Sequence, residues 1–482
     1  MEKEYEIVLG LEVHIELATK TKIFCGCTTA FGGEPNTHTC PVCTGMPGSL
    51  PVLNGKVLEY AVKVGMALNC EISRISKFDR KNYFYPDNPQ NYQISQLYLP
   101  ICHDGFLEIQ TDSGKKKVGI HEIHMEEDAG KLIHDPYEEV TLVDYNRSGV
   151  PLIEIVSDPD MESAQEVIAY LEKLRTTIQY LGASDCKLQE GSMRADVNLS
   201  VREKGSNKLG VRTEMKNLNS FRAITHAIEV EQNRQIDLLE SGKVVVQETR
   251  RFDDTKGESY AMRSKEDAKD YRYFPDPDLV PVCVEESKLE EWSAQMPEFQ
   301  EAKKKRYEES MNLPAYDASI LTETIQVASL FEQTVLLGAD PKKVSNWLMG
   351  ETMRLCRETN TGADELKFSA GHLYNLICLL EDKKINQTIA KEVFEVMFKS
   401  DCDPVEYVRV HALETVCDET ALKKAVEEVL TANEKCVNEY KNGKEKAIGA
   451  LVGQTMKAMQ GKADPSRIKE IIQEILCQGV SK

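Results

Sequence analysis

The sequence lacks several features that would assign a protein to a class at once. It has no apolar run long enough to cross a bilayer. Its start, Met1–Tyr5, resembles neither a signal peptide nor an Arg/Ser-rich transit peptide. It also has no Gly-x-x-x-x-Gly-Lys-Ser/Thr loop, no dinucleotide-binding fingerprint, and no motif for a Ser or Cys nucleophile or a glutaminase. These absences predict a cytoplasmic protein with no membrane partner, in which any nucleotide is held by other means.

Positive charge is also scarce, because 59 Lys and Arg face 79 Asp and Glu, for a net charge of −20. Taken over the whole chain, this balance argues against nucleic-acid binding, which uses Lys and Arg to contact phosphates. The C-terminal end differs. Positions 410–482 are neutral, and the stretch Lys441–Lys469 has an excess of basic residues. A local basic patch on an acidic protein is therefore predicted there.

The chain carries 14 cysteines without a secretory signal, which fits reduced thiols better than a disulfide framework. Four of them form two close pairs, Cys25-x-Cys27 and Cys40-x-x-Cys43, separated by a loop that contains Gly32, Gly33 and Pro35. Two pairs of thiolates suit a closed, tetrahedral, structural zinc site. The alternative is four unrelated reduced thiols. We predict one Zn²⁺ held by Cys25, Cys27, Cys40 and Cys43.

The length of 482 residues is too great for one core and suggests about three domains. Short alternating runs with inserted helical segments at 163–181 and 220–241 predict an α+β domain over 1–292, with a largely antiparallel sheet. Helical periodicity then predicts a helical domain over 293–408 and a small helical tail domain over 409–482.

Three short motifs carry residues suited to chemistry. In positions 10–17, strand alternation puts Glu12, His14 and Glu16 on one face, as a platform for a cation or simply as a hydrated strand face. Positions 121–128 are dense in His and acidic residues, and a solvated turn is the alternative there. In positions 212–217, Glu214 lies between two cations, as a metal ligand or as part of a surface ion pair. Separated acidic clusters of this kind can converge on Mg²⁺, which takes oxygen ligands and shares them with phosphates.

Longer segments resemble one known family, the B subunit of the tRNA-dependent amidotransferase. The resemblance covers nearly the whole chain, in order. It rests on GLEVH (10–14), KFDRKNYFYPD (77–87), HMEEDAGK (124–131), DYNRSGVPLIE (144–154), KNLNSF (216–221), QETRRF (247–252), DYRYFPDPD (270–278) and GKADP (461–465).

The resemblance implies a cradle-like first domain that uses ATP and Mg²⁺. That domain would phosphorylate the side-chain carboxylate of Glu on misacylated tRNA(Gln), of Asp on tRNA(Asn), or both. Ammonia from glutamine, made by a separate amidase subunit and delivered through a tunnel, then displaces phosphate. A small third subunit completes the complex, and the helical and tail domains grip the tRNA. This chemistry needs alignment and charge neutralisation more than covalent help from the protein.

The resemblance also implies a set of site residues. The Mg²⁺ ligands would be Glu12, His14, Glu127 and Glu214, with Glu126 as the alternative to Glu127. Strand alternation disfavours Glu127, because it shares a side with Ile123 and Met125. A His ligand leaves Mn²⁺, or contact through a water, as alternatives to direct Mg²⁺ binding. The remaining expected residues are the cofactor-binding cations Arg194 and Lys216, and Lys81 at the tunnel mouth.

Two rival functions belong to other classes. A non-catalytic tRNA-binding scaffold would share the basic C-terminal patch but would lack the cation ligands, which are present here. A zinc hydrolase needs an open metal position, and a site closed by four cysteines has none.

A last prediction concerns the helix expected around 444–460. Its apolar residues form one stripe that should pack inward: Ile448, Leu451, Val452, Met456 and Met459. Another face carries Lys446, Gly449, Gly453, Lys457 and Gln460. We predict that Lys446, Gly449, Gly453 and Lys457 bind the tRNA backbone, whereas close helix–helix packing is the alternative explanation for the glycines.

Overall fold

The computed structural model describes residues 4–112, 114–135, 137–264, 271–414, 419–441, 444, 446–459 and 463–478. The chain divides into two compact units, Met1–Phe299 and Gln300–Lys482. Unit 1 combines a large sheet with helices, and unit 2 is helical in its described segments. The predicted α+β class and helical C-terminal region are confirmed. The cradle shape and the three domain boundaries stay predictions.

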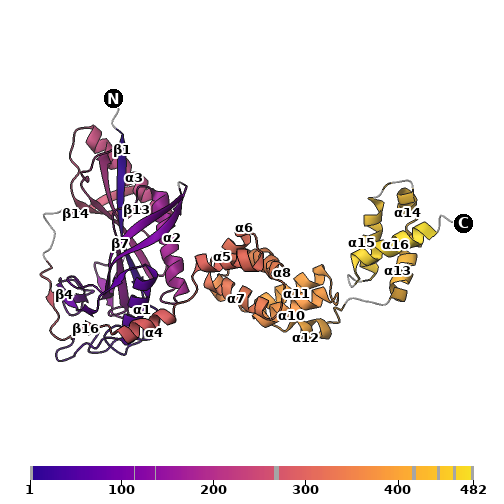
Figure 1. The fold of residues 1–482 in the computed structure, drawn as a ribbon, viewed down its shortest axis with the longest axis horizontal. Helices are drawn as coiled ribbons and strands as arrows, with labels where there is room; N and C mark the ends of the chain where they lie inside the picture. Colours follow the sequence, from indigo (N-terminus) through magenta and orange to yellow (C-terminus); the bar gives the residue numbers. More distant parts are fainter. Residues whose placement is uncertain are drawn as a thin grey trace. The chain divides into compact units, whose positions relative to one another are not determined.

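A nine-stranded sheet organises unit 1, in the order β14-β13-β12-β11-β1-β10-β7-β6-β2. Neighbouring strands within the sheet are antiparallel, except for β12 and β13, which are parallel. Figure 1 shows β1, in indigo, running through this sheet with α2 and α3 alongside. The strands of the sheet are β1 (Tyr5–Glu16), β2 (Glu71–Ile72), β6 (Cys102–Thr111), β7 (Gly114–Glu127), β10 (Pro151–Ser157), β11 (Met193–Glu203), β12 (Thr213–Lys216), β13 (Glu248–Asp253) and β14 (Glu258–Ser264).

Two two-stranded sheets and one three-stranded sheet are also described in unit 1. They comprise β3 (Ile75–Ser76) with β16 (Val282–Cys283), β8 (Lys131–His134) with β9 (Thr141–Asp144), and β15 (Phe274–Pro275), β4 (Asp79–Asn82) and β5 (Tyr92–Ser95). The helices in the described part of this unit are α1 (Gly55–Ala67), α2 (Ala164–Tyr180), α3 (Phe221–Glu240) and α4 (Glu286–Ala294).

One face of the large sheet is covered by helices, because every second residue of its strands is apolar. On β1 these residues are Leu11, Val13 and Ile15, all essentially inaccessible to solvent, and they join side chains of α1, α2 and α3 in one core. The helices start where the sequence predicts. The side chains of Ser163 and Ser220 accept hydrogen bonds from backbone amides in the first turns of α2 and α3.

The acidic segment at 121–128 is not a solvated turn. It ends the long central strand β7, which pairs with β10 through a register that sets His124 opposite Glu154. The solvated-turn alternative was therefore wrong. Charged residues at every second position of a strand share one face of the sheet. A high local density of charged residues in the sequence does not distinguish such a strand from a turn.

Unit 2 contains two separate apolar clusters in its described part, one before position 409 and one after 421. Its elements are α5 (Gln300–Met311), α6 (Ala315–Leu321), α7 (Ile325–Leu336), α8 (Pro341–Trp347), a π-helical turn (Leu348–Thr352), α9 (Met353–Thr359), a 3₁₀ turn (Ala363–Glu365), α10 (Ala370–Glu381), α11 (Gln387–Ser400), α12 (Pro404–Val410), α13 (Glu419–Ala432), α14 (Glu434–Lys441), α15 (Ala447–Ala458) and α16 (Pro465–Gln478). None of the helices in the described segments combines the length and apolar character that a bilayer crossing requires.

Candidate functional site

The face of the large sheet opposite the helices is polar along its five central strands. Glu12 and His14 of β1 lie opposite Asp196 and Arg194 of β11, and His14 also lies opposite Glu154 of β10. The alternation that buries one set of side chains under the helices therefore lines up acidic and basic groups from neighbouring strands on the other face.

The first group of potential metal ligands on this face consists of three carboxylates. Glu12, Asp196 and Glu214, from β1, β11 and β12, offer oxygens within 4.8 Å of one another. Asn198 Nδ2 donates to Glu12 Oε1 (3.0 Å), and Lys216 Nζ contacts both Asp196 and Glu214 Oε1, the latter at 2.8 Å. One lysine thus faces three carboxylates.

The pKa values of two carboxyls in this group, Glu12 and Glu214, are shifted in opposite directions. Burial, together with the charge of Glu154, raises the pKa of Glu12. Burial acts the same way on Glu214, but the neighbouring Lys216 ammonium outweighs it and lowers the pKa of that carboxyl. An all-oxygen donor set with excess negative charge fits a hard divalent cation such as Mg²⁺.

The second group lies two residues further along β1 and extends across the sheet in the opposite direction, to β10 and β7. His14, Glu126 and Glu154, from β1, β7 and β10, also bring ligand atoms within 4.8 Å of one another. The ring nitrogen Nε2 of His14 lies 3.2 Å from Glu154 Oε2 and 3.8 Å from Glu126 Oε1. His124 approaches Glu154 from the other side, also at 3.2 Å.

Glu154 is held between these two imidazoles. Burial opposes its charge, but His124 and His14 outweigh burial and lower its pKa well below the usual range. Burial likewise disfavours protonated His14, yet the hydrogen bond and charge of Glu154 raise its pKa. A mixed imidazole and carboxylate set suits transition metals such as Mn²⁺ as well as Mg²⁺.

The predicted ligands Glu12, His14, Glu127 and Glu214 are not brought together as one set. Glu12 and Glu214 share the first group, and His14 belongs to the second. Glu127 lies in neither. Its buried carboxyl accepts hydrogen bonds from the Ile94 amide (3.0 Å) and from Gln90, and burial raises its pKa to about 8. Glu126, one residue earlier, has the parity of the polar face, as strand alternation indicates.

The two expected cofactor-binding cations, Arg194 and Lys216, both come from strands of this face. Arg194 donates to Asp128 Oδ2 at 2.9 Å, and its pKa is raised because Asp128 and Glu16 outweigh the effect of burial. Lys81 of β4 is also directed to this region. Burial opposes its charge, but Glu126 outweighs it and raises its pKa, and its Nζ lies 5.1 Å from the centre of the Tyr271 ring.

The four predicted zinc ligands do converge. The sulfurs of Cys25, Cys27, Cys40 and Cys43 lie within 4.8 Å of one another. The hydrogen bond with Cys25 lowers the pKa of Cys43 to about 5, and the fully buried Lys22 places its Nζ 3.6 Å from Cys43 Sγ. A thiolate next to three further thiols is a donor set that fits tetrahedral Zn²⁺.

In the tail, the apolar stripe of α15 packs as predicted, with Ile448 and Leu451 buried and Val452, Met456 and Met459 partly buried. Gly449 and Gly453 are exposed, and a Cβ added at either would meet only open space. Close helix packing within the described chain therefore does not explain these glycines. Lys446 and Lys457 are exposed at the two ends of the helix, and Gln460 lies outside the described residues.

Two ligand candidates were missed by the sequence analysis, Glu154 and Asp196. Both carried a signal: Glu154 is the single charged residue of the apolar strand Pro151–Ser157, and Asp196 has the polar parity of its strand together with Arg194. Neither residue belongs to a cluster of acids along the chain. Only the register between strands reveals what they join.

Comparisons with known proteins agree with the expected resemblance. A family model described as the GatB/GatE catalytic domain matches residues 7–290, and one described as the GatB domain matches residues 329–476. Together these matches span most of both units.

Curated relatives match over almost their whole length. The B subunit of the aspartyl/glutamyl-tRNA(Asn/Gln) amidotransferase of Agathobacter rectalis is 64% identical over 474 residues, which is 98% of this chain and 100% of the relative. The corresponding protein of Lachnospira eligens, which has the same name, is 64% identical over 481 residues, with the same coverage. That of Caldicellulosiruptor bescii is 55% identical over 476 residues, which is 98% of this chain and 99% of the relative.

Proposed function

This chain belongs to the GatB/GatE family of tRNA-dependent amidotransferase subunits, and from that premise we propose that it phosphorylates and then amidates an amino acid esterified to tRNA. The substrate is the side-chain carboxylate of Glu on tRNA(Gln), of Asp on tRNA(Asn), or of both. The cofactors are ATP and Mg²⁺, and ammonia comes from a partner amidase subunit. A small third subunit completes the assembly.

The reaction has two balanced steps. A substrate carboxylate oxygen attacks the γ-phosphorus of ATP, the bond to the bridging oxygen breaks, and ADP leaves. Ammonia then attacks the carbonyl carbon of the acyl phosphate, phosphate leaves with the bonding electrons, and the nitrogen loses a proton to give the amide. The first step needs alignment of the phosphoryl group and neutralisation of its charge, which positioned cations supply.

A single observation supports this chemistry most strongly, namely the two neighbouring ligand groups on one sheet face. Glu12, Asp196 and Glu214 would hold Mg²⁺, and His14, Glu126 and Glu154 would hold a second divalent cation. Such cations neutralise phosphate oxygens when bound. Lys216 and Arg194 lie in the same face to contact phosphate or carboxylate oxygens. Glu127, deep beside Gln90 and Ile94, stays a candidate ligand only if its carboxyl moves out of that pocket.

The other predicted residues have structural, ammonia-delivery and tRNA-binding roles in this proposal. Cys25, Cys27, Cys40 and Cys43 would hold one structural Zn²⁺, which staples the loop between them to unit 1. Lys81, partly exposed and close enough to Glu126 for that carboxylate to raise its pKa, would lie where ammonia enters. Unit 2 would bind the tRNA body, with Lys446, Gly449, Gly453 and Lys457 on its exposed helix face, and 1–292, 293–408 and 409–482 would act as separate domains.

The proposal is tested on the purified complex with ATP, misacylated tRNA and ammonium chloride in place of glutamine. We expect ADP and amidated aminoacyl-tRNA to form in equal amounts. Because ammonium bypasses the amidase, the reaction isolates the chemistry assigned to this chain. A Glu12→Gln variant should lose both products, while glutamine hydrolysis by the partner continues.

The scaffold hypothesis predicts the opposite pattern. A chain that only binds tRNA would leave ADP formation and amide formation unchanged in the Glu12→Gln complex. That result would place the kinase chemistry on another subunit and end this proposal.

A further inference from the structure

The loop between the cysteine pairs, at 25–43 and called the zinc loop below, is hydrogen-bonded to the segment at 143–149 that leads into β10. Asn36 of the zinc loop makes three of these bonds. They join its backbone amide to Asp144 Oδ1 (3.0 Å), its side-chain amide to the Val143 carbonyl (3.0 Å), and its side-chain oxygen to the Tyr145 amide (2.8 Å). The zinc loop therefore holds a segment that is more than a hundred residues away in the chain.

A second set of contacts ties the same segment to the thiols themselves, through Lys22. This lysine is fully buried, and its Nζ lies 3.6 Å from Cys43 Sγ and 3.3 Å from the Tyr145 carbonyl oxygen. Ser148 Oγ also donates to the Cys43 carbonyl, at 3.1 Å. Burying an ammonium is costly without a counter-charge. Four thiolates outweigh the two charges of Zn²⁺, so the zinc-bound cluster supplies that counter-charge.

The held segment carries Arg147, which reaches the polar sheet face. Its guanidinium donates to the carbonyls of Ala129 (3.0 Å) and Gly130 (3.1 Å), and its Nε lies 3.3 Å from Asp128 Oδ2. The same carboxylate oxygen accepts from Arg194 at 2.9 Å. Arg147 therefore fixes the carboxylate on which Arg194, the expected cofactor-binding cation, is held.

We propose that Zn²⁺ in the four-cysteine site, acting through Lys22 and Asn36, holds this segment so that Arg147 stays on Asp128 and Arg194 stays in the polar face. The inference rests on the zinc site and the function proposed above, and it adds a physical link between them. A zinc ion that only stabilised its own loop would not account for a buried lysine that joins the thiols to a carbonyl of another segment.

The first test measures the zinc affinity of the purified complex by competition with a chromophoric chelator. Lys22→Met keeps a long unbranched side chain but removes the charge. It should weaken zinc binding by about 10–100-fold, the range for groups that support metal ligands from outside the coordination sphere. Lys20→Met is the matched control, because it removes an exposed lysine two positions away. It should leave the zinc affinity unchanged.

The second test follows hydrogen exchange of the amides at 143–149 by mass spectrometry, before and after the chelator removes zinc. Exchange there should rise roughly tenfold while α2 stays protected, because the opening is local. Asn36→Gly should reproduce this rise with zinc still bound, and Gly tolerates the left-handed conformation of Asn36 (φ 60°). Asn69→Gly is the control, since this left-handed asparagine of unit 1 (φ 57°) donates to the Phe106 carbonyl instead.

The third test separates positioning from a general loss of stability. Amidation with ammonium is compared in Asn36→Gly, in Arg147→Gln and in the double variant. If Asn36 acts through Arg147, the double variant should be no slower than Arg147→Gln alone, whereas independent effects would multiply. The Asn69→Gly control should amidate at the rate of the wild type.

Exchange at 143–149 that does not respond to zinc removal overturns the proposal, and so does a chain that contains no zinc. Unchanged zinc affinity in Lys22→Met overturns it as well, and Asn36→Gly and zinc removal decide the question where Lys22→Met does not fold. These failures are separate from a failure of the proposed function, because zinc affinity and exchange are measured without ATP or tRNA. A complex can lose amidation in Glu12→Gln and still show exchange that is independent of zinc.

Discussion

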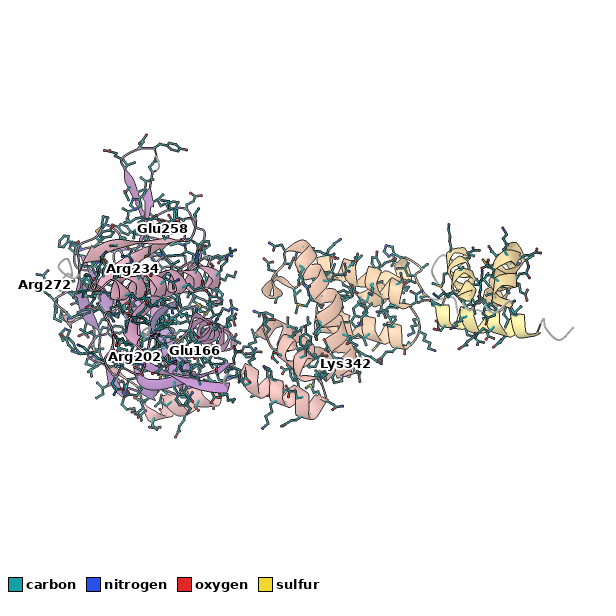
Figure 2. All side chains as sticks on the ribbon, turned by 90° about the horizontal axis from the view of Figure 1, so that it is seen from above. Glu166, Arg202, Arg234, Glu258, Arg272 and Lys342 are labelled. Carbon is teal, nitrogen blue, oxygen red and sulfur yellow. The ribbon has the colours of Figure 1, made fainter. Side chains whose placement is uncertain are left out.

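Both faces of the nine-stranded sheet hold carboxylates away from water, but they balance the charge in different ways. On the helix-covered face, the fully buried Glu231 of α3 accepts from Arg234 at 2.7 and 2.8 Å, from Thr213 and from Gln235. Arg234 is labelled in Figure 2 within unit 1. Every oxygen of this carboxylate is satisfied by the chain itself.

On the polar face, the group of Glu12, Asp196 and Glu214 is short of positive charge. Lys216 is shared between Asp196 and Glu214, and among the described residues the Glu12 carboxylate accepts one hydrogen bond, from the side-chain amide of Asn198. Burying charge without full compensation costs stability. The contrast indicates that one face is built to be complete within the chain and the other to be completed by cations and substrate.

The largest expected effect comes from removing one charge from the incomplete face. Glu214→Gln should lower the rate of ATP-dependent amidation by a factor on the order of 10²–10³, the size found when one transition-state electrostatic contact is lost. Its melting temperature should hardly change, because the amide oxygen can still accept from Thr249. A rate close to that of the wild type, with ADP and amide measured together, would remove Glu214 from the site.

The complete face should respond in the reverse way. Glu231→Ala leaves the half-buried Arg234 without its main partner. Breaking a buried pair costs about 3–5 kcal/mol, and we expect the lower end because Arg234 keeps some contact with water. Thermal unfolding should show a clear loss of stability, with amidation per folded molecule nearly unchanged. A stable but inactive variant would mean that this network, which anchors β12, also sets the geometry of Glu214.

The same network predicts a pH dependence. Burial would raise the pKa of Glu231, but Arg234, Gln235 and Thr213 outweigh it, so the pKa lies below the ordinary value of 4.5. Its stabilising contribution is therefore complete above pH 4.5 and is lost as the pH falls through the folded-state value. The difference in melting temperature between the wild type and Glu231→Gln should be constant from neutral pH down to about 4.5, and should shrink below it. A gap that widens on acidification would contradict the assignment.

The comparison also explains what the sequence could and could not predict. Alternation along single strands placed Glu12 and His14 on one face of their strand and Leu11, Val13 and Ile15 on the other, because side-chain direction is a local property. It likewise placed Glu214 with Lys216 on one face of a second strand, but it did not show that the two faces join. The partners across strands were not predictable in this way. Asp196 and Glu154 join the ligand groups only through the register of β1 with β11 and β10.

Glu127 is a residue for which the family resemblance and strand alternation gave different predictions. The resemblance implied it as a ligand, whereas its parity on β7 directs it to Ile94 and Gln90. The cysteine cluster needed no register information, because two short spacings bring the thiols of each pair together. The basic C-terminal stretch was evident from composition, but whether its glycines were packed or open depended on the fold of the tail.

The four-cysteine cluster is a third site that we expect to be completed by a bound ion, here Zn²⁺. Purified protein should contain one zinc per chain, and Cys40→Ala should lose it and lower the melting temperature by a few degrees, because metal binding adds directly to folding stability. Cys283→Ala is the control, since that thiol is exposed and outside the cluster. Zinc-free protein with a Cys40→Ala variant of equal stability would leave four unrelated thiols.

The smallest expected effect is on tRNA binding by the tail, where the exposed glycine face of α15 lies open to solvent. Gly449 and Gly453 on α15 are open to solvent, and each costs the helix about 1 kcal/mol relative to Ala. Since no packing within the described residues offsets that cost, close approach of an RNA backbone is the explanation that we test. Lys457→Glu should weaken tRNA binding several-fold and lower the slope of log affinity against log salt by about 1, the effect of one lost phosphate contact.

Gly453→Trp should weaken tRNA binding by blocking the same face, while Gly453→Ala, with its small side chain and better helix propensity, separates steric blocking from helix stability. ADP affinity and amidation at saturating tRNA should stay as in the wild type, because α15 belongs to unit 2 and the polar sheet face to unit 1. Phosphate contacts of this kind add affinity without reading bases, so cognate and non-cognate tRNAs should lose affinity equally. If both Lys457→Glu and Gly453→Trp fold and bind tRNA as tightly as the wild type, the exposed glycines serve another partner, and the basic stretch contacts RNA through other residues or not at all.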